Sequence, residues 1–139
     1  MIRTAQAVYV DTGAWIALAL TKDPYHDRAL EIWTGLADAG ARLHSSVSVI
    51  IETFTFLDRQ TTRDVAVAWR RSLDRIPRFR VWPVTPRDLD EAWPFFDRPD
   101  LHKLSAVVAV SFVLMRRAKI RTAFAFDHHF TTAGFRLLG

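Results

Sequence analysis

The sequence predicts an α/β fold with a mostly parallel central sheet and helices on both of its faces. Short apolar runs typical of buried strands alternate along the chain with longer segments of helical periodicity. The chain has 139 residues, half of them hydrophobic and about a quarter charged, which suits a single domain covering residues 1–139. It has no internal repeat and no Gly/Ser-rich linker that would divide it.

The first elements are a strand, two helices and a second strand. Ala7–Val10 is a short apolar run, and Thr12 to about Leu20 is a short helix. Pro24 suits the first turn of a helix that extends to about Asp38, because its apolar positions have helical spacing. Arg42–His44 is a further short strand.

Two helices and a strand follow. Val47 to about Leu57 is apolar on nearly every side; we predict a helix because the segment follows two serines that can cap it. Thr62–Ile76 carries an apolar stripe at helical spacing, and Pro77 ends it. Phe79–Val84 is a strand in which Pro83 indicates an edge position or an early end.

The C-terminal part begins with a cap and ends with two strands. Thr85–Asp88 has an N-cap threonine, a proline and an acid in the order that opens a helix, and Pro94 must kink or end that helix. Leu104–Met115 is apolar all round and predicts a central buried helix. Thr122–Phe126 and Phe135–Leu138 are the last strands.

The charge balance is basic, with 19 Lys and Arg against 15 Asp and Glu, and 16 of the 19 cations are arginine. Arginine binds phosphates through paired hydrogen bonds and stacks on bases, so the bias suits a nucleic-acid partner. It fits an arginine-rich genome composition equally well, and it indicates no particular chemistry.

Two features that the sequence lacks exclude several classes of site and of protein. The chain has no cysteine, which excludes a disulfide scaffold, a thiolate zinc site and a cysteine nucleophile. No apolar run reaches the length of a membrane span, and the N-terminus lacks the pattern of a signal peptide. We therefore expect a cytoplasmic protein without a membrane partner.

Three carboxylates stand where structure alone would not place them. Asp11 and Asp127 each follow an apolar run, and Glu52 lies inside one. Each has an ordinary alternative, because the aspartates could cap helices or turns and Glu52 could be solvated or pair with an arginine. The ends of parallel strands meet at one sheet edge, so we expect the three acids to converge there. A cluster of carboxylates suits a hard divalent cation such as Mg²⁺.

Other chemistries have weaker support. His128 and His129 could be zinc ligands beside Asp127, but adjacent residues rarely reach one ion and no ligand-spaced partner is present. The sequence contains no glycine-rich dinucleotide loop, no phosphate-binding P-loop and no serine-hydrolase elbow. Gly13 stands where an aspartyl-phosphate phosphatase would need a second aspartate.

Three motifs together resemble PIN domains. VDTGAWIAL, which begins at Val10, resembles the first acidic motif of that family, and SVSVIIETFTFL around Glu52 resembles the second. The segment from Ser111, SFVLMRRAKIRTAFAFDHHFTTAGFRLL, resembles the end of VapC-type toxins of toxin–antitoxin pairs. The resemblance covers essentially the whole chain.

The resemblance implies a three-layer α/β/α fold and a metal-dependent RNA endonuclease. It implies that Asp11, Glu52 and Asp127 are catalytic and hold Mg²⁺ or Mn²⁺, which activates a water for attack on an RNA phosphodiester. It also implies a homodimer that is silenced by a small VapB-like antitoxin.

The fourth acid of the family pattern is missing. Val108 stands where the aspartate of the S-x-T-D segment is expected. Either the site is degenerate and activity is impaired, or Asp100 in the upstream loop supplies the carboxylate. The alternative function is therefore a weak or inactive PIN-fold module that binds RNA or an antitoxin, and a third possibility is an unrelated α/β protein such as a phosphoryl-binding regulator.

Arginines should accompany the acids, because a bare acidic cluster repels RNA. We predict that Arg98, in the loop before the central helix, and Arg116 and Arg117, after it, rim the cleft and bind RNA. An exposed solvated arginine face is the alternative.

Overall fold

A computed structural model describes residues 5–139 and shows one five-stranded sheet in which every strand pair is parallel. The strand order is β3-β2-β1-β4-β5. The strands are β1 (Ala7–Val10), β2 (Arg42–Ser46), β3 (Phe79–Trp82), β4 (Thr122–Phe124) and β5 (Arg136–Leu138). The predicted parallel sheet is confirmed, with β3 at one edge.

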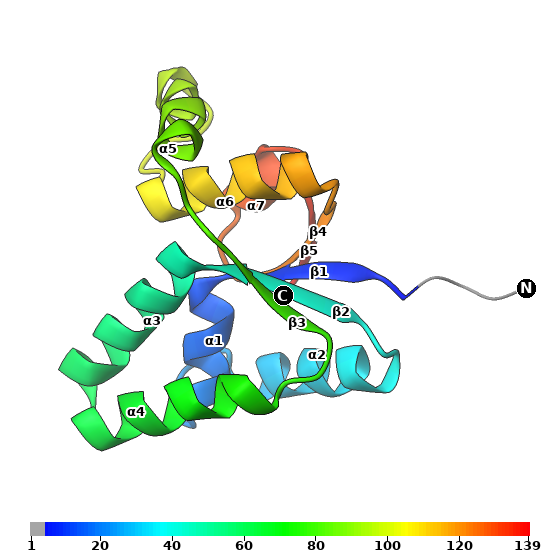
Figure 1. Cartoon of the computed structure of the whole chain (residues 1–139), viewed down its shortest axis with the longest axis vertical. Helices are drawn as coiled ribbons and strands as arrows, with labels where there is room; N and C mark the ends of the chain where they lie inside the picture. The colour runs from blue at the N-terminus through cyan, green and yellow to red at the C-terminus, as the bar shows by residue number, and fades with distance from the viewer. Residues whose placement is uncertain (1–4) are drawn as a thin grey trace, which may run out of the picture.

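Helices cover both faces of this sheet, which gives the three-layer α/β/α architecture (Figure 1). One layer holds α1 (Thr12–Ala19), α2 (His26–Asp38), α3 (Val47–Gln60) and α4 (Arg63–Ser72), which runs on into the 3-10 turn η1 (Leu73–Arg75). The other holds α5 (Pro86–Ala92), the 3-10 turn η2 (Trp93–Asp97), α6 (Ala106–Ala118) and α7 (His129–Thr132). Among residues 5–139, every helix is too short or too polar to cross a lipid bilayer.

Caps and prolines set the helix ends largely as predicted. The Ser46 side chain caps α3 by accepting a hydrogen bond from the Val49 amide at 3.2 Å. Thr85 and Asp88 form a capping box at the start of α5, which gives way to a 3-10 turn at Pro94. Pro24 is different: it lies in a turn held by Asp23, and α2 begins only at His26.

Strands β3 and β4 are shorter than predicted. β3 ends at Trp82, because Pro83 has no amide hydrogen to continue the ladder. β4 ends at Phe124, opposite Leu138, where β5 also ends. Asp127 is therefore three residues beyond the strand, on the turn that leads into α7.

The direction of α6 decides which residues meet at each edge of the sheet. Its residues Val108 to Met115 are all buried, as an all-round apolar helix predicts. The helix leads directly into β4, so it runs antiparallel to the strands, and its first turn lies at their carboxyl edge while its last turn lies at their amino edge (Figure 1).

Candidate functional site

Asp11 lies at the carboxyl end of β1 and is only 4% exposed. It occupies the N-cap position of α1, yet its side chain makes no capping hydrogen bond. Its backbone carbonyl accepts the Ala14 and Trp15 amides, but its Oδ1 atom is buried without a hydrogen-bond partner. A buried carboxylate oxygen without a partner is costly, so helix capping does not account for this residue.

The other two acids act on Asp11 electrostatically. The pKa of Asp11 is raised to about 7, mainly by burial and in addition by the negative charges of Asp127 and Glu52. The backbone amides of Thr12 and Gly13 partly offset this increase. Glu52 on α3 and Asp127 on the turn after β4 thus both act electrostatically on Asp11, which follows β1 at the carboxyl edge of the sheet.

Glu52 comes from the second turn of α3, which begins directly at the carboxyl end of β2. Its side chain is half-buried, between the exposed Ile51 and the fully buried Thr53. Among residues 5–139 no lysine or arginine forms an ion pair with it. The alternative in which Glu52 neutralises an arginine therefore has no support within that range.

His129 contacts the side chain of Asp127, and the sequence did not predict this contact. Asp127 Oδ1 accepts the His129 amide at 2.9 Å and lies 2.6 Å from His129 Nδ1. His129 Nε2 lies 2.7 Å from the carbonyl oxygen of His102, and the ring is buried. Both ring nitrogens thus lie close to oxygen atoms of the protein, which fixes the orientation of the ring beside Asp127. The sequence feature that could have indicated this contact is the histidine two residues after Asp127.

The same residues bear on the zinc alternative. Potential ligand atoms of Asp127, His128 and His129 lie within 4.8 Å of one another. Both nitrogens of His129 already face other groups, however, and His128 is exposed. The arrangement therefore favours His129 as a support for Asp127 over a role as a zinc ligand.

A network of buried hydroxyl groups lies next to the acids. Tyr9 Oη donates a hydrogen bond to Ser46 Oγ at 2.9 Å and lies 2.7 Å from Ser111 Oγ. Burial raises the pKa of Tyr9, and the charges of Asp11 and Glu52 add to this effect. Tyr9 therefore stays neutral and ties β1 to the start of α3 and to the middle of α6 without adding charge.

Val108 lies in the first turn of α6 and is only 5% exposed. The Ser105 side chain caps this turn by accepting the amides of Val107 and Val108. The apolar side chain adds neither charge nor a ligand atom at this end of the helix.

Asp100 is exposed and is engaged elsewhere. Its two carboxylate oxygens accept hydrogen bonds from Arg98 at 3.0 and 2.7 Å, and this pairing lowers its pKa. Arg98 also reaches the carbonyl of Thr132 at 3.3 Å. Asp100 would have to leave Arg98 before it could replace the missing acid.

Arg116 and Arg117 lie in the last turn of α6, at the opposite edge of the sheet from the acids. Arg117 pairs with Asp88 and, at 3.0 Å, with Glu91 of α5. Arg116 lies over the Phe95 ring and reaches the Ala133 carbonyl at 3.5 Å. A helix of this length spans about 20 Å, so the structure does not bring these two arginines to the acidic edge, contrary to our expectation.

The donor set fits a hard divalent cation. Asp11 offers a buried oxygen that no protein group satisfies, and the negative charges of Glu52 and Asp127 act on it. Within residues 5–139, however, the ligand atoms that lie within 4.8 Å of one another are those of Asp127, His128 and His129, so an ion shared by the three acids would need their side chains to move closer together. Carboxylate oxygens are the ligands that Mg²⁺ and Mn²⁺ prefer.

The sequence profile of the PIN domain matches residues 8–136. The chain belongs to the PIN domain family. It is 35% identical over 128 residues to the 23S rRNA-specific endonuclease VapC20 of two Mycobacterium tuberculosis strains, covering 92% of this chain and 95% of the relative. The resemblance to VapC-type toxins is thereby confirmed.

Two solved structures share the fold. The crystal structure of M. tuberculosis VapC20, described as a sarcin-ricin loop cleaving toxin, matches with a TM-score of 0.81 and 34% identity, over 92% of this chain and 95% of that one. VapBC2 from Rickettsia felis, bound to a DNA fragment from its promoter, matches with a TM-score of 0.65 and 10% identity, over 95% and 97%. The second likeness extends to the fold alone.

Proposed function

We propose that this PIN domain protein is a metal-dependent RNA endonuclease of the VapC type. The observation that carries the proposal is the buried, unpartnered Oδ1 of Asp11 within electrostatic reach of Glu52 and Asp127. Three carboxylates that repel one another lower stability unless a cation joins them. The fold tolerates this cost at the edge where parallel α/β sheets form their sites.

Asp11, Glu52 and Asp127 would hold Mg²⁺ or Mn²⁺. A bound ion of this kind supplies an activated water and stabilises charge that develops on a phosphoryl group. The chain supplies the positioning. The start of α1 fixes the backbone of Asp11, and His129 fixes one oxygen of Asp127. Tyr9 links β1 to the N-cap of α3 and to the middle of α6.

The substrate that we propose is a structured loop of ribosomal RNA. This rests on the 35% identical relative, which is named as a 23S rRNA-specific endonuclease. Such an enzyme would act in the cytoplasm and need a silencing partner, so we propose a small VapB-like antitoxin and a homodimeric toxin, as for VapC-type toxins in general.

The second candidate is a PIN-fold module with weak or no catalysis that binds RNA or an antitoxin. The observation that favours it is Val108, a buried apolar residue where the family pattern has an acid. A three-acid cluster carries less negative charge and leaves one coordinating or water-orienting position unfilled. Asp100 remains a candidate for that position only if it separates from Arg98.

Cleavage of a defined RNA separates the two candidates. Purified protein is incubated with a ribosomal stem-loop that contains the sarcin-ricin sequence, or with a shuffled stem-loop, and with Mg²⁺, Mn²⁺ or a chelator. We expect metal-dependent cleavage of the first RNA by the wild type and none by Asp11→Asn, which also controls for contaminating nuclease. RNA binding without cleavage under every condition would favour the module.

A further inference from the structure

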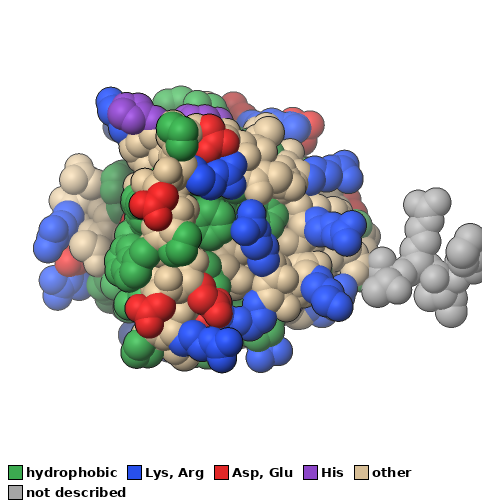
Figure 2. Space-filling view, turned by 90° about the horizontal axis from the view of Figure 1, so that it is seen from above, with side chains coloured by type: hydrophobic (Ala, Val, Ile, Leu, Met, Phe, Trp, Pro, Cys, Tyr) green, Lys and Arg blue, Asp and Glu red, His purple; other side chains and the backbone are tan. Residues whose placement is uncertain are grey.

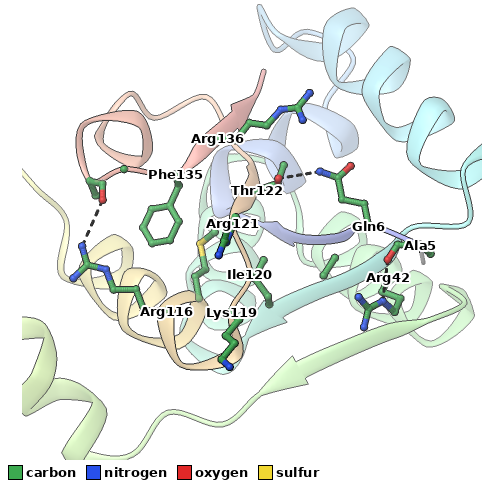
Figure 3. Close-up of a pocket in the computed structure, with 14 residues that line it drawn as sticks. Ala5, Gln6, Arg42, Arg116, Lys119, Ile120, Arg121, Thr122, Phe135 and Arg136 are labelled. Carbon is green, nitrogen blue, oxygen red and sulfur yellow. Dashed lines mark hydrogen bonds between the residues drawn. The ribbon is translucent and has the colours of Figure 1, made fainter. Parts of the chain in front are cut away.

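A second charged region lies at the amino edge of the sheet, away from the acids. A cavity of about 1050 Å³ opens there between the starts of β1, β2, β4 and β5 and the end of α6 (Figure 3). We call it the amino-edge pocket. Within residues 5–139, the residues that line it include no acid and five cations: Arg42, Arg116, Lys119, Arg121 and Arg136.

These five cations are exposed, and within residues 5–139 none of them pairs with a carboxylate. Arg42 reaches the backbone carbonyl of Ala5 at 3.2 Å, and Arg116 lies over the Phe95 ring and reaches the backbone carbonyl of Ala133 at 3.5 Å. Six other arginines of the chain do pair with acids, on the helices and in the loop before α6. The pocket thus concentrates positive charge that the protein itself leaves uncompensated.

Strand register aligns two of these arginines. Arg42 pairs with Ala7 on one side of β1, and Thr122, the neighbour of Arg121, pairs with Val8 on the other. Arg42, the first residue of β2, and Arg121, the residue before β4, therefore lie at the same level on the two strands that flank β1, about 10 Å apart. In Figure 2, Lys and Arg side chains gather on the right-hand side of the view, and most acidic side chains lie farther to the left.

The dipole of α6 explains only part of this charge. Cations are favourable near the carbonyl groups at a helix C-terminus, which accounts for Arg116 and Lys119. It does not account for Arg42 and Arg136, which begin β2 and β5, or for Arg121, which directly precedes β4. The half-buried Phe135 also lines the pocket and offers an aromatic surface among the cations.

Lys119 adds a conformational argument. It ends α6 with a φ of 58°, the left-handed conformation in which glycine or asparagine is usual. A lysine there costs on the order of 1 kcal/mol. The chain thus places a lysine, with its positive charge, at the pocket although glycine at this position would give a more stable fold.

We propose that the amino-edge pocket binds the phosphate backbone of RNA. Several unpaired arginines around an aromatic side chain match phosphates and bases better than they match an acidic peptide, which offers no flat ring to stack. The pocket lies about 13 Å from the acids, the length of four strand residues from Ala7 to Asp11. It would therefore hold a part of the RNA outside the cleaved segment, and in this respect the inference rests on the proposed function.

The binding test uses full-length Asp11→Asn protein, so that RNA stays intact, and a fluorescent ribosomal stem-loop. In this background we expect Arg121→Glu with Arg136→Glu to raise the Kd at least about tenfold and to reduce the slope of log K against log salt by about two. The matched control is Arg71→Glu with Arg75→Glu, exposed residues of the other helical layer with the same charge change, for which we expect less than a twofold effect. Thermal melts verify folding, and Arg121→Gln with Arg136→Gln is the milder pair.

Two further measurements complete the test. In a protein that retains Asp11, the pocket variant should raise KM for the stem-loop and leave cleavage of a short oligonucleotide unchanged. The inference would be overturned if the pocket variant lost the same fraction of cleavage activity on the stem-loop and on the short oligonucleotide. Equal Kd values for the pocket and control variants would also overturn it. Displacement of RNA by polyglutamate as readily as by polyuridylate would overturn it in favour of an acidic protein partner. A wild type that cleaves nothing would refute the proposed function and leave the binding result valid.

Discussion

The two edges of one sheet carry opposite charge and differ in what that charge costs. At the carboxyl edge Asp11 is buried, one of its oxygens lacks a partner and its pKa is raised to about 7. At the amino edge five cations are exposed to solvent, where charge costs little. A buried acid without a partner is therefore stronger evidence of a functional site than an exposed arginine. The inference that the amino-edge pocket is a binding site rests on three observations together: the strand register, the missing ion-pair partners and the positive φ of Lys119.

The first prediction concerns the energetic cost of the acidic edge. Because the pKa of Asp11 rises from 3.8 to about 7 on folding, the metal-free folded protein binds a proton that the unfolded chain has lost between these values. Its free energy of unfolding should therefore fall as pH rises through this interval, by up to about 4 kcal/mol. Denaturant titrations in a chelator at several pH values measure the effect.

The comparison with Asp11→Asn isolates this contribution. The lowered pKa of His44, caused by burial and by Arg42 and Arg80, acts in the opposite direction near neutral pH but is common to both proteins. The lowered pKa of Asp88, which Thr85 and Arg117 stabilise as the anion, matters only at more acidic pH. Parallel pH curves for wild type and Asp11→Asn would contradict the prediction.

The second prediction separates stability from activity at the same residue. Asp11→Asn should reduce metal-dependent RNA cleavage more than about 100-fold, since even groups that only support metal ligands are worth 10–100-fold. At pH 8 without metal the same variant should unfold at a higher denaturant concentration than the wild type. Single-turnover cleavage and unfolding curves provide the two readouts.

Asp100→Asn is the matched control for this residue. Its carboxylate is exposed and bound to Arg98, so we expect less than a twofold change in cleavage. A loss comparable to that of Asp11→Asn would instead identify Asp100 as the fourth acid.

Much of the acidic edge could be predicted from the sequence, because single positions carry the signal. Asp11 and Asp127 follow apolar runs, and strand ends in a parallel sheet share an edge. His129 could not be assigned in this way, since its contact with the carbonyl of His102 depends on how two loops pack. Pro24 was misplaced in a helix because the Asp23 turn competes with it.

The cluster of arginines at the starts of the strands could not be predicted, because each of them resembles an ordinary surface residue. Only the register places Arg42 and Arg121 on either side of β1. The expected position of Arg116 and Arg117 beside the acids neglected the direction of α6, which must run back along the sheet to start β4. Connectivity alone was sufficient to predict that these two residues lie at the amino edge.

The third prediction restores charge to the acidic edge. If Val108 faces the acids, Val108→Asp should tighten Mg²⁺ or Mn²⁺ binding about tenfold, equivalent to about 1.4 kcal/mol, and should increase cleavage. Without metal the buried carboxylate should lower the melting temperature. Calorimetric metal titration and melts with and without metal measure both effects.

Val108→Asn distinguishes added charge from added polarity. It buries a polar group of similar size but supplies no negative charge, so it should destabilise the fold without any gain in metal affinity. If Val108→Asp behaves like Val108→Asn, then Val108 is an ordinary core residue and the degenerate site cannot be restored at this position.

The last prediction concerns Lys119, where stability and RNA binding should change in opposite directions. Lys119→Gly relieves the positive φ, so we expect a gain of about 0.5–1 kcal/mol and a melting temperature higher by about 2–4 °C, with RNA binding about two- to threefold weaker because one phosphate contact is lost. Lys119→Ala is the control: it removes the same charge but keeps the unfavourable backbone, so it should weaken binding equally without raising the melting temperature. Anisotropy titrations and thermal melts of the two variants decide the matter. A glycine variant that is more stable and binds RNA as well as the wild type would exclude Lys119 from the amino-edge pocket's function and leave the four arginines as its only cations.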